Sequence, residues 1–355
     1  QADWERLAEE AVTATRSVYP RTKPEQLRED LALLMESLIA IARGQEPPVE
    51  VGTLSLGDYA PYMSAPHRMD LMVSAMTQDG AWHCNQKCLH CYAAGQPMGE
   101  SRELTTAQWK EALERLRHAN IPQVTFTGGE PTLRADLVEL VEAAQWFVTR
   151  LNTNGRLLTP ELCRRLYEAS LDSVQVTLYS ADAAVHNTLV GASVNTPLCS
   201  LNRDYAVTLR FVHELGVRYV TCSGLIPSGG AETEASQATR LTQEELTAVL
   251  RQAVETAEEL GMEIDFTSPG WLPEETLRSL GLHLIPSCGA CLSNMAVTPG
   301  GQVVPCQSWL GGTTLGNLLT DDWSAIWDGE TCRAIRAKSA KLEHICQLGG
   351  GNREG

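Results

Sequence analysis

The sequence predicts an α/β protein built on a parallel sheet, with a helical segment before it and a cysteine-rich segment after it. Three observations predict this fold class. Apolar residues recur at helical spacing through residues 1–43. From about residue 72, short apolar runs alternate with amphipathic stretches, and strands that alternate with helices favour a parallel sheet. After about residue 266, cysteines and glycine-rich turns replace this alternation. We therefore expect three regions, at residues 1–70, 71–266 and 267–355.

Two helices are expected in the first region. Trp4 and Leu7 mark the apolar face of the first helix, and Leu31 and Leu38 mark that of the second. A proline-containing turn at residues 20–24 separates them, and Pro47-Pro48 begins an irregular linker. The role of these helices is open, and simple packing is the first expectation.

Six strands are expected in the middle region, at residues 72–77, 124–127, 147–152, 174–178, 193–196 and 219–223. Helices are expected between several of them, at residues 106–118, at 137–144 and from Thr159 onward. Active sites on parallel sheets lie in the loops that follow the strands, so functional residues are expected there. Only 13 residues intervene between Tyr179, just after the fourth strand, and Ser193, where the fifth begins, which is short for a parallel crossover.

Composition excludes several function classes. The chain has 355 residues, of which 43% are hydrophobic and 20% charged, as in soluble globular enzymes. A net charge of -16 argues against nucleic acid as a main partner. No apolar run is long enough to span a membrane, and no secretion signal is recognisable, so we expect a cytoplasmic protein. Eleven cysteines in such a chain favour metal binding over disulfides.

Three cysteines follow the first expected strand. Cys84, Cys88 and Cys91 stand at positions i, i+4 and i+7, with Tyr92 directly after them. Closely spaced thiolates suit an iron–sulfur cluster or zinc. A structural zinc site normally has four protein ligands. Three thiols in one loop therefore favour a cluster with one open iron, with a structural zinc site as the alternative.

A second motif, Thr-Gly-Gly-Glu-Pro at residues 127–131, ends the second expected strand. Glycine lets the backbone approach a ligand closely, and a glutamate can accept a hydrogen bond from an ammonium group. Together with Cys-x3-Cys-x2-Cys-Tyr, this motif resembles the radical S-adenosylmethionine (SAM) enzymes. The resemblance implies a partial (β/α)6 TIM-like barrel and a [4Fe-4S] cluster whose open iron binds SAM. It also implies reductive cleavage of SAM to a 5′-deoxyadenosyl radical.

The resemblance implies that the following residues lie beside SAM: Tyr92, Gly128, Gly129, Glu130, Asn152, Asn154, Thr177 and Asn195. In such enzymes the Gly-Gly-Glu motif holds the amino group of the methionine part of SAM. Residues 152–155 could equally form a plain turn. Val190 stands where many relatives have an arginine, so the carboxylate of SAM needs another partner, for which Arg203 is a candidate.

The last region resembles the SPASM and Twitch auxiliary-cluster domains. The resemblance rests on Cys-x9-Gly-x4-Cys, from Cys291 to Cys306, with a zinc ribbon as the alternative. It implies at least one auxiliary [4Fe-4S] cluster, with Cys288, Cys291 and Cys306 as ligands and Cys346 as a candidate fourth. A full SPASM domain has further cysteines, which are missing after Cys346. Two other cysteines, Cys163 and Cys332, are expected to be buried structural residues.

The favoured function is modification of a ribosomally synthesised peptide, by crosslinking or epimerisation, with flavodoxin or ferredoxin as electron donor. A small-molecule dehydrogenase or epimerase, or a non-catalytic iron–sulfur protein, are the alternatives. Gln307 stands where sulfatase-maturing relatives have an aspartate base, which argues against that activity. Cys222, at the end of the sixth strand, is the candidate catalytic hydrogen-atom donor, followed by Cys199. Burial in the core is the competing interpretation for both.

Overall fold

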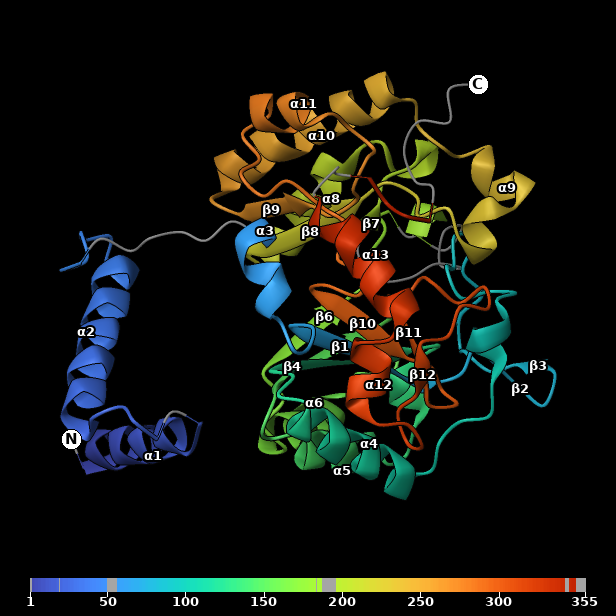
Figure 1. The fold of residues 1–355 in the computed structure, drawn as a ribbon. Coiled ribbons are helices and arrows are strands. Elements are labelled where there is room, and N and C mark those ends of the chain that lie inside the picture. Colours follow the sequence, from blue (N-terminus) through green and yellow to red (C-terminus); the bar gives the residue numbers. More distant parts are fainter. Residues whose placement is uncertain are drawn as a thin grey trace. The chain divides into compact units, whose positions relative to one another are not determined.

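The computed structural model describes residues 2–18, 20–49, 56–182, 184–186, 196–341 and 345–348 (Figure 1). Asn195, Val190 and most of the expected fifth strand lie outside the described residues. The chain divides into two compact units, Gln1–Tyr59 and Ala60–Gly355. No helix in the described part has the length and apolar character needed to cross a membrane.

The first unit contains the two expected helices, α1 (Ala2–Val18) and α2 (Pro24–Ala42), and a short third one, α3 (Leu56–Tyr59). Pro24 occupies the first turn of α2, where its missing N–H costs nothing. An ion pair between Arg28 of α2 and Glu9 of α1, 2.6 Å long, joins the two helices. Both helices were predicted from apolar spacing, and both are confirmed.

The larger sheet of the second unit has seven strands in the order β12-β11-β10-β1-β4-β5-β6. The parallel part comprises β10 (Asn294–Val297), β1 (Arg68–Ser74), β4 (Gln123–Gly128), β5 (Val148–Thr153) and β6 (Ser173–Val176). The antiparallel end comprises β11 (Gln302–Val304) and β12 (Gly316–Asn317). The cysteine-rich region therefore extends the sheet that β1 begins.

A second, three-stranded parallel sheet has the order β7-β8-β9. Its strands are β7 (Thr196–Pro197), β8 (Tyr219–Ser223) and β9 (Glu263–Phe266). Among the described residues, no ladder joins β6 to β7, so the six expected strands are divided between two sheets. A small hairpin, β2 (Thr77–Gln78) with β3 (Ala81–Trp82), lies between β1 and the three cysteines of the first motif.

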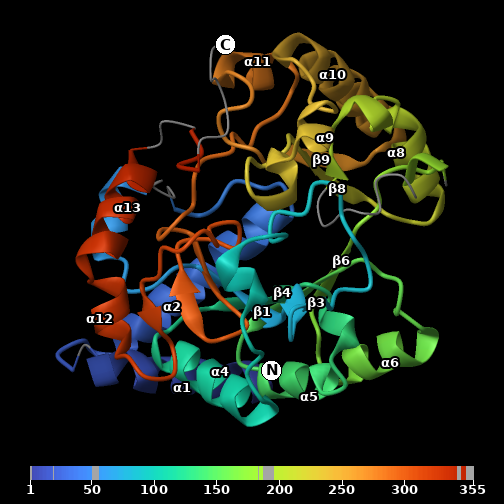
Figure 2. The ribbon, with the colours of Figure 1, turned by 90° about the vertical axis from the view of Figure 1, so that its right-hand side faces the viewer.

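Helices cover both sheets, as Figures 1 and 2 show. Three lie in a row beside the larger sheet, namely α4 (Thr106–His118), α5 (Leu137–Ala143) and α6 (Pro160–Glu168). The smaller sheet carries α8 (Tyr205–Glu214) and α10 (Gln243–Leu260), with the short helices α9 (Glu234–Gln237) and α11 (Glu274–Ser279) nearby. Next to β10–β12 lie α12 (Trp323–Trp327) and α13 (Glu330–Ala340).

The two largest apolar cores among the described residues hold most of the second unit together. The larger core includes Trp109 of α4, Phe126 of β4, Leu151 of β5 and Ile335 of α13, so the carboxyl-terminal helices share it with the parallel strands. The other core lies between the smaller sheet and its helices. This arrangement fixes the carboxyl ends of β1, β4, β5 and β6 along one edge. The predicted α/β class with parallel strands is confirmed.

Candidate functional site

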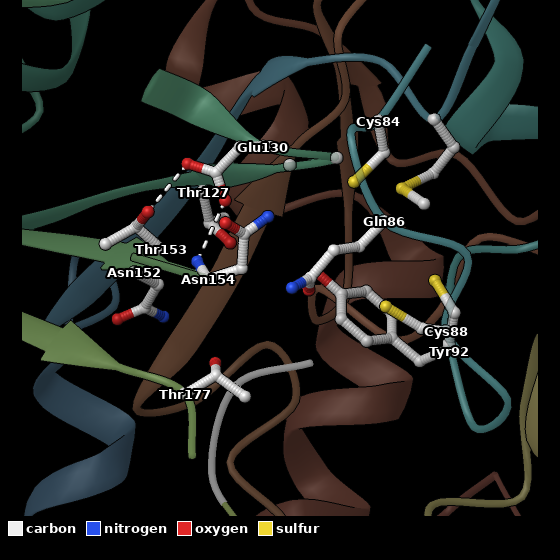
Figure 3. Close-up of a pocket in the computed structure, with 14 residues that line it drawn as sticks. Cys84, Gln86, Cys88, Tyr92, Thr127, Glu130, Asn152, Thr153, Asn154 and Thr177 are labelled. Carbon is white, nitrogen blue, oxygen red and sulfur yellow. Dashed lines mark hydrogen bonds between the residues drawn. The ribbon is translucent and has the colours of Figure 1, made fainter. Parts of the chain in front are cut away.

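The three cysteines of the first motif lie beyond the carboxyl end of β1 and line one cavity (Figure 3). Burial raises the pKa of Cys84 to about 11. The Cys88 thiol donates a hydrogen bond to Cys91, which raises the pKa of Cys88 and lowers that of Cys91. Within the described residues, no three His, Cys, Asp or Glu side chains are already arranged as a metal site. The three soft thiols facing one cavity nevertheless form a donor set that suits iron–sulfur binding.

The Gly-Gly-Glu turn packs directly against the start of the cysteine loop. The Gly129 N–H donates to the Ser74 carbonyl at 2.7 Å. A Cβ on Gly128 would lie 2.2 Å from the Ser74 oxygen, and one on Gly129 would lie 2.6 Å from the Ala75 oxygen. No larger residue fits without moving the backbone, and Gly128 also has a φ of 131°. Glycine is therefore required at Gly128 by contact with the end of β1, and at Gly129 by contact with the start of the cysteine loop.

Glu130 ties the end of β4 to the end of β5. Its carboxylate accepts hydrogen bonds from the Thr153 hydroxyl at 2.7 Å, the Asn154 N–H at 2.8 Å and the Thr132 N–H at 3.0 Å. The Thr132 hydroxyl donates a further one. Only Oε2, which accepts from Asn154 alone, has room for another donor. Glu130 therefore orients the loops after two strands and keeps one lone pair for a ligand.

Several polar atoms face this cavity without a partner. Asn152 Oδ1, Thr177 Oγ1 and Gln86 Oε1 are buried and have no hydrogen-bond partner in the described part of the chain. An unsatisfied buried polar group costs roughly 1–3 kcal/mol, so a ligand that donates hydrogen bonds would relieve it. SAM carries an ammonium group, ribose hydroxyls and an amine. The donors of SAM thus fit the acceptors that the cavity presents.

A loop after β8 donates hydrogen bonds to backbone carbonyls of the cysteine loop, and the sequence did not predict this contact. The Gly230 N–H donates to the Cys91 carbonyl at 2.7 Å. The Ser228 hydroxyl donates to the Tyr92 carbonyl at 3.2 Å. A Cβ on Gly229 would lie only 2.4 Å from that same carbonyl oxygen. The sequence contains one indication of this loop, the run Pro-Ser-Gly-Gly at residues 227–230. It follows the carboxyl end of a parallel strand, as the cysteine loop and the Gly-Gly-Glu turn do.

The auxiliary cysteines form two neighbouring groups. Burial first, and then the nearby Cys346 and Cys288, raise the pKa of Cys306 to about 12. Cys306 and Cys346 line a cavity of about 170 Å³. Cys291 instead donates a hydrogen bond from its thiol to the Cys332 sulfur, and this contact lowers the pKa of Cys332. Cys332 is buried, as expected, but its partner is one of the predicted cluster ligands.

The remaining predicted residues lie elsewhere. Cys222 is fully buried, with its Sγ 3.7 Å from the Asp265 carbonyl, and Cys199 is also buried; neither lines the cavity of the first motif. Arg203 pairs with Glu245 at 2.6 Å and does not line that cavity either.

The expected burial of Cys163 is wrong. The buried face of α6 passes through Leu166, with Leu162 partly buried beside it, and Cys163 lies around the helix from this face.

Known proteins resemble the chain in sequence over part of its length. A stretch of 107 residues is 39% identical to a probable GTP 3′,8-cyclase of Methanopyrus kandleri. A stretch of 97 residues is 39% identical to an Fe-coproporphyrin III synthase of Methanosarcina barkeri. These stretches cover 30% and 27% of this chain. They span only 34% and 24% of the two relatives.

Solved structures resemble it over most of its length. Streptococcus suis SuiB bound to the precursor peptide SuiA aligns over 94% of this chain and 77% of its own, with a TM-score of 0.62 and 16% identity. SuiB bound to SAM aligns over 98% and 83%, with a TM-score of 0.63 and 15% identity. Native anSMEcpe with bound AdoMet aligns over 78% and 84%, with a TM-score of 0.58 and 16% identity. These likenesses show the fold.

Family models match two stretches of the second unit. Residues 83–227 match the radical SAM superfamily, and residues 288–348 match SPASM, an iron-sulfur cluster-binding domain. The first match contains the three cysteines and the Gly-Gly-Glu turn, and it implies a [4Fe-4S] cluster and SAM as cofactors. The second contains the four predicted auxiliary ligands and implies auxiliary iron–sulfur clusters. The chain therefore contains a radical SAM domain, followed by a SPASM iron–sulfur cluster-binding domain towards its carboxyl-terminal end.

Proposed function

We propose that this protein modifies a ribosomally synthesised peptide by abstracting a hydrogen atom from an unactivated carbon, which leads to a crosslink or to an epimerised residue. When bound, the reduced [4Fe-4S] cluster supplies the electron that cleaves SAM and so provides the radical that abstracts this hydrogen. A flavodoxin or ferredoxin would deliver the electron in a reducing cytoplasm. The superfamily membership supports an enzyme, and the peptide substrate is the new element.

One observation carries the proposal. The likeness to SuiB bound to its precursor peptide extends over 94% of the chain, so it includes more than the cofactor-binding part. The sequence relatives, by contrast, match only 107 and 97 residues of this chain, so they carry less weight for the substrate of the whole chain. The fold common to the whole chain therefore favours a peptide substrate.

In this proposal, some residues of the first cavity bind the cluster and others bind SAM. Cys84, Cys88 and Cys91 hold the cluster, because they are the three thiols that line the cavity. The free lone pair of Glu130 Oε2 accepts from the ammonium group of SAM. The unpaired oxygens of Asn152 and Thr177 accept from other donors of SAM, such as the ribose hydroxyls.

The auxiliary cysteines lie where a long substrate could reach them. The cavity that Cys306 and Cys346 line is also lined by loops after β8 and β9, including Pro227, Ser268 and Trp271. These loops stand at the carboxyl ends of parallel strands, the side on which such sheets carry their active sites. In the proposal, Cys288, Cys291, Cys306 and Cys346 hold an auxiliary cluster that accepts an electron from the substrate or binds it.

The names of the two sequence relatives favour a second candidate, a small-molecule substrate. One assay separates the two. Reconstituted protein is incubated anaerobically with SAM, a reductant and either a short peptide encoded beside its gene or candidate small molecules. We expect 5′-deoxyadenosine together with a peptide that has lost two hydrogens, or that gains deuterium in D2O. Unchanged peptides alongside an altered small molecule would overturn the proposal.

A further inference from the structure

Gln86 stands between two cluster cysteines, yet its side chain extends from the loop into the cavity (Figure 3). Its backbone is fixed on both sides. The Trp82 indole donates to the Gln86 carbonyl at 2.8 Å, and the Gln86 backbone also forms a hydrogen bond with the Cys84 sulfur. The whole residue is only 5% exposed. With the backbone held this way, the direction of the side chain is set by the loop.

The carboxamide oxygen of Gln86 has no hydrogen-bond partner among the residues that the structure describes. Its neighbour in the sequence behaves differently, because Asn85 Oδ1 accepts from Asn154 Nδ2 at 2.7 Å. Asn85 thus joins the cysteine loop to the loop after β5, whereas Gln86 leaves its acceptor open toward the cavity. A buried amide without a partner is unfavourable unless a ligand completes its hydrogen bonds.

The acceptors around Gln86 indicate what kind of ligand is needed. Asn152 Oδ1 and Thr177 Oγ1, on neighbouring strand ends, are unpaired in the same way. Three of the four hydrogen bonds to Glu130 occupy one oxygen, so this carboxylate can take little more. An ammonium group has three donors and cannot be satisfied by one remaining lone pair. Further acceptors are therefore required for the donors of SAM.

We propose that Gln86 is a SAM-binding residue, whose carboxamide forms a hydrogen bond with a polar group of SAM rather than with the cluster. This deepens the proposed function, since it rests on SAM occupying this cavity. An amide is not a soft ligand, so iron binding should not depend on it. Gln86 would then raise the affinity for SAM while the three thiols alone hold the iron.

The test uses the full-length reconstituted protein and two variants of Gln86. Gln86→Met keeps the length and removes the hydrogen bond, and Gln86→Glu keeps an acceptor. Lys87→Met is the matched control, because Lys87 is the exposed next residue in the same loop. Iron content and the dissociation constant for SAM, from equilibrium dialysis, are measured for each. We expect unchanged iron in all variants and SAM binding about tenfold weaker in Gln86→Met only, equivalent to about 1.4 kcal/mol.

Two results would overturn this assignment. One is SAM binding by Gln86→Met within about twofold of the native protein. The other is loss of iron from both Gln86 variants, which would make the residue part of the loop's own structure. If Gln86→Met binds SAM more weakly but the native protein modifies no peptide, the peptide proposal fails and the role of Gln86 stands. If peptide is modified normally and SAM affinity is unchanged, only the role of Gln86 fails.

Discussion

Arg134 holds together three segments on which the first cavity depends, so Arg134→Met should destabilise the fold strongly. The guanidinium donates to the carbonyls of Val73 at 3.0 Å and Leu104 at 3.2 Å. It also pairs with Glu103 at 3.1 Å and with Asp136 at 2.7 Å. The side chain of Arg134 is only 9% exposed, and those of its two acidic partners are 14% and 19% exposed.

The expected loss of stability follows from the two carboxylates that Arg134→Met leaves without their partner. Removing one partner of a buried ion pair costs about 3–5 kcal/mol, because the remaining charges lose their compensation. The partial exposure of the two carboxylates places the expected loss near the lower end, at about 3 kcal/mol. Glu103 also accepts from the Ala75 N–H at 2.8 Å, so the start of the cysteine loop should loosen as well.

Urea unfolding of the purified protein measures this loss against a matched control. Arg164→Met removes an arginine that also pairs with two carboxylates, Glu161 and Glu168, but its side chain is 55% exposed. Exposed pairs of this kind contribute little to stability, because solvent screens the attraction between the charges. Equal losses for the two variants would refute the reasoning that burial, and not the number of ion pairs, makes Arg134 important.

Three further predictions follow from the same structure. Asp136→Asn should be less stable than the native protein at pH 7, and this difference should shrink as the pH falls below 3.8; burial raises the pKa of Asp136, but its hydrogen bonds, with Arg134 foremost, lower it overall from 3.8, so its contribution is lost as the pH falls through this lowered value. Urea unfolding at pH 7 and at a series of lower pH values measures this, and a difference that stays constant down to the lowest pH would contradict it. The native protein should bind about eight iron atoms per chain, and the Cys84, Cys88 and Cys91 triple alanine variant about four; a variant without iron would rule out an auxiliary cluster. Cys222→Ala should lose about 1 kcal/mol of stability and still form product in D2O, because the thiol is fully buried; loss of product while 5′-deoxyadenosine still forms would make Cys222 the hydrogen-atom donor.

The cysteine loop and the Gly-Gly-Glu turn could be predicted from sequence because each is a local pattern that follows a strand. The start of β1 could not, since the strand begins at Arg68, four residues before the apolar run. Its first residues include Asp70, which is 1% exposed and pairs with Arg68 at 2.9 Å. From the sequence alone, a buried charged residue with an ion-pair partner cannot be distinguished from an exposed charged residue.

Contacts between segments that are far apart in the sequence could not be predicted either. The pairing of β10 with β1 joins Asn294 to Arg68, and no local pattern encodes which strand lies next to which. The support that Gly229 and Gly230 give to the cysteine loop depends on the same kind of long-range packing. For Cys163, residue type alone predicted burial, but the position of the residue on α6 decided the outcome.

The central claim is that Cys84, Cys88 and Cys91 together enable SAM cleavage, and the yield of 5′-deoxyadenosine tests it most directly. Each cysteine is replaced by alanine in turn, and the reduced, reconstituted protein is incubated with SAM. Cys163→Ala is the control, because this thiol is exposed on α6 and lies outside both groups of predicted ligands. We predict native yield from the control and no 5′-deoxyadenosine above background from the other three, since no thiol of the set is spare. Native yield from any one of those three variants would contradict the account.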